Sequence, residues 1–364
     1  MSDKKSFTLL LLIKGRHEFT KRWLKYMNKI NFNYPIIIAD GQDDNETEKM
    51  INEINLEKKL SIEYYRYNTH SGYLDYYKMK KDALSKVKTN LVMLCDNDDF
   101  IIPSGLEEQI NFLSSNKEYI SSSGRILNFE INNFEFVEYG KDFYFLNPCK
   151  YYRFNEPLIN WNDQIKSIFT QFQPNFYNVF KTQYIRIIVQ ELVEQNFSDL
   201  VINEFYIQLR AATLGKSKII DNTFHYIRQR GTSSISKDYK FSMDVLKKDM
   251  PQDVRKMATK IGEILSTDHH ISKDNIKNHI LKSFSEYLNY FLANTTLKYR
   301  FPNLYRFKIN IIKILREKLS FMNFIYKKIK SYFVLKKIIY LSDKSKSNIL
   351  KNELLEIEKL LSKN

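Results

Sequence analysis

The chain has 364 residues, of which 43% are hydrophobic, so it is long and apolar enough to bury a core, which excludes a disordered tail. Its formal net charge is +15, and residues 240–364 carry 26 Lys and Arg against 12 Asp and Glu, so the excess charge lies in the last third. Cys95 and Cys149 have no metal-ligand spacing, which excludes a cysteine-based metal site and predicts a reducing, cytoplasmic setting.

Strand and helix signals alternate through the first hundred residues. The apolar run Phe7–Ile13 is too short to cross a bilayer and predicts a buried first strand. The next predicted elements are a helix at 18–30, a strand at 35–39, a helix at Glu46–Ile54, a strand at 61–67, a helix at 74–87 and a strand at 90–95. This alternation predicts a mostly parallel sheet of right-handed βαβ units, which binds ligands at the carboxyl ends of its strands.

Polar residues follow three of the four predicted strands, and we expect them to meet at one edge of the sheet. They are Lys14-Gly15-Arg16, Asp40-Gly41 and Asp96-Asn97-Asp98-Asp99. Carboxylate oxygens suit hard divalent cations. The sequence has no Gly-x-Gly-x-x-Gly and no complete Gly-x-x-x-x-Gly-Lys-Ser/Thr loop, so a diphosphate bound here would need another counter-charge, such as a metal ion.

These elements, in this order, resemble the nucleotide-sugar-dependent glycosyltransferases of the GT-A fold, particularly family 2, over about residues 6–235. The resemblance implies a Rossmann-like α/β domain. It implies that Asp40 contacts the nucleobase and that Asp96 and Asp98 contact the ribose and, through Mn²⁺ or Mg²⁺, the diphosphate. Asp98 is then the metal ligand, and Asp99 matches the extra acid that often follows. The alternative for Asp40 is a turn cap, a common use of Asp.

Four further residues near these strand ends are candidates for donor binding. They are Lys14, Arg16, Asn97 and Lys81, the last of which shares the helix at 74–87 with Lys78. An exposed basic helix face is the alternative for the two lysines.

A candidate general base lies a hundred residues further on. Family 2 enzymes typically place a Glu-Asp pair at the head of a helix, and here Ser198-Asp199 precedes the helical segment 201–214. The resemblance implies that Asp199 deprotonates the acceptor hydroxyl, with Glu204 as the competing candidate. The alternative for Asp199 is a helix N-cap.

The segment 223–234 resembles the family loop that closes over the donor diphosphate. Arg228 and Arg230 are its implied phosphate contacts, and His225 is a possible metal ligand. The alternatives are solvated arginines and a half-buried strand histidine.

Aromatic and amide residues are frequent between 119 and 181, where the resembled family recognises its acceptor. Alternation at 125–131 and 134–139 predicts a β-ribbon, and 171–177 leads into another strand. Tyr151, Tyr152 and Trp161 are candidates for stacking on sugar rings, against the alternative of ordinary packing.

The chain is predicted to divide into a GT-A domain at 1–238 and a basic helical region at 239–364. Residues 298–337 hold 12 basic residues and one acid. One helical stripe comprises Ile311, Leu315, Leu319, Met322, Tyr326, Ile329 and Phe333. Such a helix either lies on an anionic membrane surface or packs on the protein. The apolar positions of 345–363 predict a terminal helix that forms an oligomer contact.

We therefore expect a metal-dependent, inverting glycosyltransferase that uses a nucleotide-sugar donor and a glycan or lipid-linked acceptor. We expect it in the cytoplasm, either free or peripheral on the inner face of the membrane. One alternative is an inactive GT-A scaffold that binds a nucleotide or a partner. A nucleic-acid-binding protein is disfavoured, because the acids cluster at the strand ends while the basic excess lies in the tail.

Overall fold

The computed structural model describes residues 6–54, 60–68, 72–131, 137–146, 160–170, 175–230, 250–300, 303, 304, 307, 310, 320–342 and 344–362. Its strands are β1 (Phe7–Ile13), β2 (Ile36–Asp40), β3 (Ile62–Arg66), β4 (Leu91–Cys95), β5 (Phe100–Ile101), β6 (Tyr119–Ile131), β7 (Phe143–Leu146), β8 (Val179–Lys181) and β9 (Lys216–Gln229). The helices of the first half are α1 (His17–Lys29), α2 (Glu46–Ile54), α3 (Tyr73–Lys86), α4 (Pro103–Ser115) and α5 (Trp161–Thr170). Those of the second half are α6 (Thr182–Gln195), α7 (Leu200–Leu214), α10 (Met250–His269), α11 (Lys273–Arg300), α13 (Ser320–Leu341) and α14 (Ser347–Leu361).

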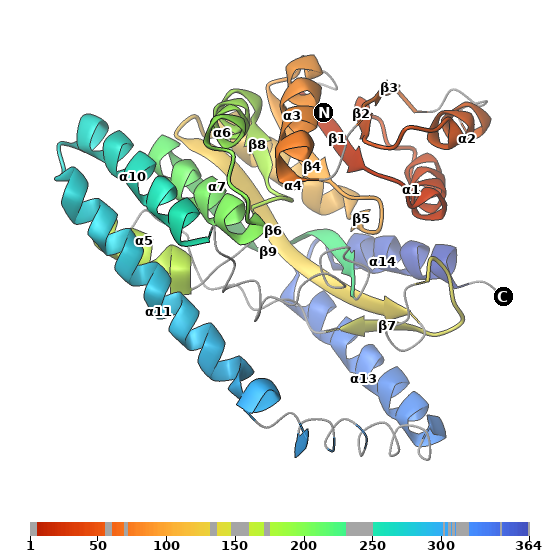
Figure 1. Cartoon of the computed structure of the whole chain (residues 1–364). Helices are drawn as coiled ribbons and strands as arrows, with labels where there is room; N and C mark the ends of the chain where they lie inside the picture. The colour runs from red at the N-terminus through yellow and green to blue at the C-terminus, as the bar shows by residue number, and fades with distance from the viewer. Residues whose placement is uncertain are drawn as a thin grey trace.

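One nine-stranded sheet runs through the molecule in the order β3-β2-β1-β4-β8-β6-β9-β5, with β7 paired to β6 (Figure 1). The strands β3, β2, β1 and β4 are all parallel, as the βαβ alternation predicts. Beyond β4 the sheet changes character, because β8 pairs antiparallel with both β4 and β6. The predicted α/β sheet followed by a helical region is confirmed.

The continuous apolar run of β1 is explained by burial on both faces of the sheet. Phe7, Leu9 and Leu11 face a core that includes Trp23 of α1, whereas Leu10 and Leu12 face a second core filled by α3, α6 and α7. A strand covered on both sides has no polar face, so its sequence does not alternate.

The predicted β-ribbon exists, but its second strand lies later in the chain. Asn128 to Ile131 of β6 pair antiparallel with β7 at 143–146. Residues 137–139, which the alternation assigns to the ribbon, are not strand. The pattern of polar and apolar residues at 134–139 therefore predicted the ribbon but not its register.

The C-terminal helices complete both cores. The helices α10 and α11 pack against α7 and α5, α13 packs on β7, and α14 contacts α4 and α13. The apolar side of α14 is buried against the rest of the protein. Its Leu350, Leu354, Ile357 and Leu361 belong to the core that includes Trp23 of α1. The terminal helix is therefore part of this core, whereas Ile349 is exposed, and the oligomer contact stays a prediction.

Among the described residues, none of the helices combines the length and the hydropathy that a membrane crossing requires. The predicted boundary at residue 238 falls within 231–249, outside the described residues, and stays a prediction.

Candidate functional site

The polar residues after β1, β2 and β4 meet at one edge of the sheet, as the sequence predicts. In the parallel register Ile13 is opposite Asp40, and Leu11 is opposite Cys95. The chain leaves β1 through a tight turn in which Gly15 and Arg16 both have left-handed backbone conformations, with φ of 65° and 62°. That conformation is easy for glycine, but it costs about 1 kcal/mol or more for arginine.

This turn brings Arg16 to the acid cluster that follows β4. Its Nη2 lies 3.0 Å from Oδ2 of Asp98, and its guanidinium stacks 4.4 Å from the ring centroid of Phe19. Burial raises the pKa of Asp96 to about 6, and the charge of Asp98 adds to this rise. The cluster therefore concentrates negative charge in a poorly solvated place, where a cation is strongly attracted.

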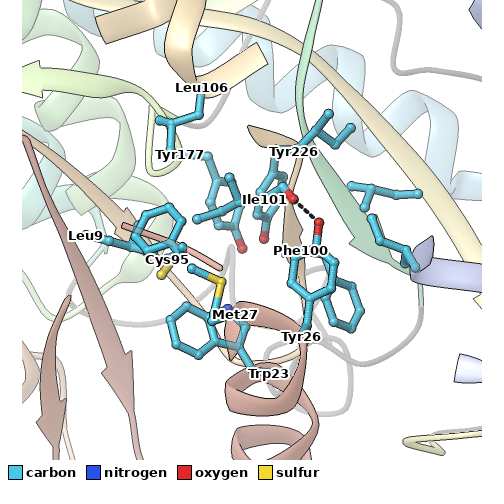
Figure 2. Packing of buried hydrophobic residues seen from close by; sticks show 14 of the residues in the cluster. Leu9, Trp23, Tyr26, Met27, Cys95, Phe100, Ile101, Leu106, Tyr177 and Tyr226 are labelled. Carbon is cyan, nitrogen blue, oxygen red and sulfur yellow. Dashed lines mark hydrogen bonds between the residues drawn. The ribbon is translucent and has the colours of Figure 1, made fainter. Parts of the chain in front are cut away.

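Two tyrosines hold Asp99 inside the protein. The hydroxyl groups of Tyr177 and Tyr226 both donate to Oδ2 of Asp99, and the backbone N–H of Gln229 donates to Oδ1 at 2.8 Å. Figure 2 shows the two rings side by side, with centroids 3.8 Å apart. Tyr177 also donates to Asp96 at 3.2 Å. Asp99 thus ties residues 96–99, which we call the acid loop, to the end of β9. Burial raises the pKa of Asp99 to about 8.

Arg22 of α1 fastens the same loop from the other side. Its Nη2 donates to the backbone oxygen of Asp98 at 2.8 Å, and its Nη1 donates to Oε1 of Gln229 at 2.8 Å and to the backbone oxygen of Glu138 at 2.6 Å. The ring of Phe100 lies 4.9 Å from the guanidinium carbon. Burial lowers the pKa of Arg22 to about 10, so it stays charged at neutral pH.

A buried lysine and a glutamate add two titratable groups. Burial lowers the pKa of Lys80, on α3, to about 7, and the charges of Asp96 and Glu204 oppose that fall. Burial raises the pKa of Glu204, on α7, to about 7, although Arg228 and Lys80 oppose the rise. Three rings lie within 5.3 Å of the Lys80 ammonium, those of Tyr76, Tyr77 and Phe176.

Asp199 is the N-cap of α7. Its Oδ1 accepts hydrogen bonds from the backbone N–H groups of Val201 at 2.8 Å and of Ile202 at 3.3 Å. Ser198, which stands where family 2 typically has Glu, donates from its backbone and its hydroxyl to Oδ2 of Asp253, each at 2.7 Å. Asp199 and Glu204 interact electrostatically across the start of this helix.

Two of the predicted site residues make hydrogen bonds within the protein. Asp40 is fully buried and accepts from the backbone N–H of Gln42 at 2.9 Å and from the hydroxyl of Tyr64 at 3.2 Å, which is the turn-capping role. The Nδ2 of Asn97 donates to Thr20 of α1 at 2.8 Å. Both side chains are buried, and their donor-binding roles stay predictions.

His225 is also engaged on both ring nitrogens. The backbone N–H of Gly124 donates to Nδ1 at 3.1 Å, so Nε2 carries the proton and donates to the backbone oxygen of Tyr177 at 2.9 Å. Burial lowers its pKa to about 4, which keeps the ring neutral. Both ring nitrogens are thus hydrogen-bonded within the protein, and the metal role of His225 stays a prediction.

The predicted basic residues divide into two groups. Arg228 is at the site, with Nε 4.0 Å from Oδ2 of Asp99. Burial alone would lower the pKa of Arg228, but the neighbouring Tyr177 and Asp99 raise it, so the guanidinium stays charged. The side chains of Lys14, Lys81 and Arg230 are exposed.

Four residues of the site were not predicted from the sequence. A signal existed for Arg22, because it lies on the apolar side of α1 beside Phe19 and Tyr26, at helical spacing. Lys80 follows two tyrosines on α3 and was hidden among neighbouring lysines. Nothing local marks Tyr177 and Tyr226, because Asp99 is 78 residues away along the chain from the nearer of them.

Some predicted acceptor contacts lie outside the described residues, namely Tyr151 and Tyr152, as do residues 231–234 of the predicted diphosphate loop. Trp161 begins α5 and packs, partly buried, against the second core.

The carboxylates of the acid cluster are suitable ligands for a divalent cation, but they do not form a complete set of ligands on their own. The described residues contain no group of three His, Cys, Asp or Glu side chains placed to bind one. Asp96 and Asp98 offer hard oxygen ligands, and Mg²⁺ is usually held by one or two carboxylates together with substrate phosphates. In this structure the cation beside Asp98 is Arg16.

Comparisons with known proteins agree with this architecture. No protein-family model matches the sequence, and no curated protein matches it. Among solved structures, S. aureus TarS 1-349 matches with a TM-score of 0.53 at 12% identity, covering 98% of this chain and 89% of that one. The same protein in complex with UDP matches with a TM-score of 0.50 at 13% identity, with coverage of 98% and 89%. The chain therefore has the fold of TarS, a GT-A-type glycosyltransferase.

Proposed function

We propose that the protein is a glycosyltransferase of the family 2 type, which moves a sugar from a nucleotide-sugar donor to a hydroxyl group of a glycan or lipid-linked acceptor. The observation that carries the proposal is the meeting of opposite charges at one edge of the sheet. Arg16, Lys80 and Arg228 surround the carboxylates that follow β4, with Glu204 beside them. A diphosphate needs those cations, and an acceptor hydroxyl needs a base.

Uridine is the proposed base of the donor. The support is that TarS, whose fold this chain shares, has been solved in complex with UDP. The three cations differ in chemistry: two are guanidinium groups, whereas Lys80 is an amine that is charged only below its pKa of about 7. We assign Lys80, rather than the exposed Lys81, to the diphosphate.

Mn²⁺ or Mg²⁺ is proposed as the cofactor, held by Asp98 together with Asp96 and the donor phosphates. When bound, the cation would neutralise negative charge on the leaving diphosphate. Arg16 would have to release Asp98 for this.

The reaction needs one proton acceptor. The acceptor hydroxyl attacks the anomeric carbon, its proton passes to a carboxylate, and the bond to the diphosphate breaks, so the nucleoside diphosphate leaves and the anomeric centre inverts. The resemblance assigns the proton to Asp199. The pKa of about 7 favours Glu204, since a base works best when its pKa is near the working pH. We propose that the base is one of these two.

The test is thermal unfolding of the full chain with UDP and Mn²⁺, followed by transfer assays with UDP-sugars. Saturation at about 100 times Kd should stabilise the fold by roughly 2.7 kcal/mol. Asp98→Asn and chelation should each remove the stabilisation that depends on Mn²⁺, while Asp253→Asn, which alters an acid outside the cluster, should keep it. Equal stabilisation by UDP in the presence of chelator would contradict the metal role.

The inactive scaffold remains the alternative, because Ser198 has replaced a carboxylate and is tied to α10. A scaffold would bind UDP with Mn²⁺ but transfer no sugar from any donor to any acceptor.

A further inference from the structure

The helix α13 is anchored to the sheet along one side only. Ser331 accepts a hydrogen bond from the backbone N–H of Phe145 at 2.8 Å, and Lys327 pairs with Glu130 of β6 at 2.6 Å. Val334 and Ile338 are buried between these anchors and the neighbouring helix. The helix is therefore held at a fixed angle on β7, as Figure 1 shows at its lower right.

The opposite side of α13 presents a continuous exposed face, which we call the outer face. Its positions recur at 3, 4, 7, 10, 11 and 14 residues after the first, the spacing of one side of a helix. It consists of Tyr326, Ile329, Lys330, Phe333, Lys336, Lys337 and Tyr340. The four apolar side chains are exposed to 61%, 52%, 62% and 83% in that order. Three members of the predicted stripe, Tyr326, Ile329 and Phe333, are thus turned outward.

The charges on this face have one sign. The sequence of α13 holds five lysines and no Asp or Glu. Lys327 is paired with Glu130 on the inner side. In contrast, Lys330, Lys336 and Lys337 make no ion pair with any of the residues that the structure describes, and Lys330 lies 5.8 Å from the ring centroid of Tyr326.

We infer that the outer face of α13 docks the protein onto an anionic lipid bilayer. Tyr and Phe side chains at helical spacing bury their rings at the level of the head groups, while neighbouring lysines extend to the phosphates. The helix then lies in the plane of the surface, since the buried side is already committed to β7. This inference goes beyond the proposed function, because docking needs neither donor nor acceptor.

A second copy of the chain fits this face less well. A symmetric contact through the outer face would place three lysines against three lysines with no carboxylate on the helix to compensate, and like charges across an interface oppose association. A soluble polyanion would satisfy the lysines but would leave four large apolar side chains in water. A bilayer surface with anionic lipids satisfies both.

The experiment is sedimentation of the full chain with vesicles of phosphatidylcholine alone and of phosphatidylcholine with 30% phosphatidylglycerol. We expect binding only to the anionic vesicles, falling as salt rises. Each lysine near such a surface contributes about fivefold in affinity, so the triple variant Lys330→Gln, Lys336→Gln, Lys337→Gln should bind roughly 100-fold more weakly. Tyr326→Ser with Phe333→Ser should also weaken binding at least tenfold.

The matched control is Lys25→Gln, Lys88→Gln, Lys282→Gln, which removes the same charge from exposed lysines elsewhere and should change affinity less than threefold. All variants should keep the thermal midpoint of the wild type, since their side chains are exposed. Equal loss in the control and the α13 variant would overturn the inference. So would binding that the aromatic variant leaves unchanged, or a change of oligomeric state in place of a change in vesicle binding. UDP binding is read separately, so failure here leaves the proposed function standing.

Discussion

Asp199 has two candidate roles, as the N-cap of α7 and as the general base, and substitution by asparagine distinguishes them. An Asn side chain keeps the oxygen that caps α7 but cannot accept a proton, so Asp199→Asn should fold like the wild type. If Asp199 is the base, kcat should fall at least about 100-fold with UDP affinity unchanged. Asp199→Ala should in addition lose about 1 kcal/mol of unfolding free energy, because the cap is lost.

The matched variant on the same helix is Glu204→Gln. If it abolishes transfer and Asp199→Asn does not, Glu204 is the base. Its pKa also predicts an effect on stability: ionising a carboxyl group whose pKa is raised from 4.5 to about 7 by burial weakens the fold as pH rises through that interval. Glu204→Gln should therefore be more stable than the wild type at pH 8, by about 1–3 kcal/mol, and equal to it near pH 4 in urea titrations.

Lys80 predicts a pH dependence of donor binding with the opposite sign. Its pKa is lowered to about 7, so its charge is present below that pH and lost above it. UDP affinity should decline above pH 7, by up to about tenfold per pH unit. Lys80→Met should bind UDP weakly and remove this decline.

The control for Lys80 is its exposed neighbour. Lys81→Met should keep the pH profile of the wild type in calorimetric titrations with UDP, because its side chain lies in solvent. A profile that stays flat in the wild type, or that flattens in Lys81→Met, would show that Lys80 does not contact the diphosphate.

At the scale of elements, Arg22 joins α1 to the acid loop and to the end of β9. Arg22→Met would leave three backbone and side-chain acceptors without a donor, so we expect a loss of about 2–4 kcal/mol of unfolding free energy. Arg22→Lys should recover little, because one ammonium group cannot reproduce the fork of donors. Lys25→Met, on the exposed side of the same helix, should change stability by less than about 0.5 kcal/mol in urea unfolding.

Local sequence patterns predicted the bounds of the first strands and helices closely. The bounds of β1 and α2 agree with the sequence prediction, those of β2 and α3 differ by one residue at both ends, and β4 differs by one residue at its start. The convergence of Asp40, Arg16 and Asp98 followed from parallel strand order alone. In contrast, the partners of Asp99 come from β9 and from the segment before β8, and no spacing rule connects residues that only tertiary pairing brings together.

Amphipathic stripes predicted which helices exist but not which side faces the core. In α13 Tyr326, Ile329 and Phe333 of the predicted stripe are exposed, and the buried side is built from Ser331, Val334 and Ile338. The buried side is the one that meets the partners of the helix on the sheet, Phe145 and Glu130. A predicted helix face is therefore only a proposal until its neighbours are known.

For the whole molecule, the two cores cross the predicted boundary between the GT-A domain and the helical region. Leu350 and Leu354 of α14 share a core with Trp23 of α1, and Ile261 of α10 shares the other with Leu10 of β1. Glu353 of α14 accepts hydrogen bonds from the backbone and the hydroxyl of Ser104, at the start of α4. These contacts predict that the chain unfolds as one unit.

A pair of substitutions on α14 tests this prediction. Leu354 is fully buried, so Leu354→Ala removes core volume and should cost about 2–5 kcal/mol. Ile349, on the same helix, is 52% exposed, and Ile349→Ala should cost less than about 0.5 kcal/mol. If the cores are continuous, Leu354→Ala shifts the entire urea transition, whether it is followed by the fluorescence of Trp23 and Trp161 or by circular dichroism. A separate early transition, with the tryptophan signal at its wild-type midpoint, would show instead that the C-terminal helices unfold independently and that residues 1–238 stand as a domain of their own.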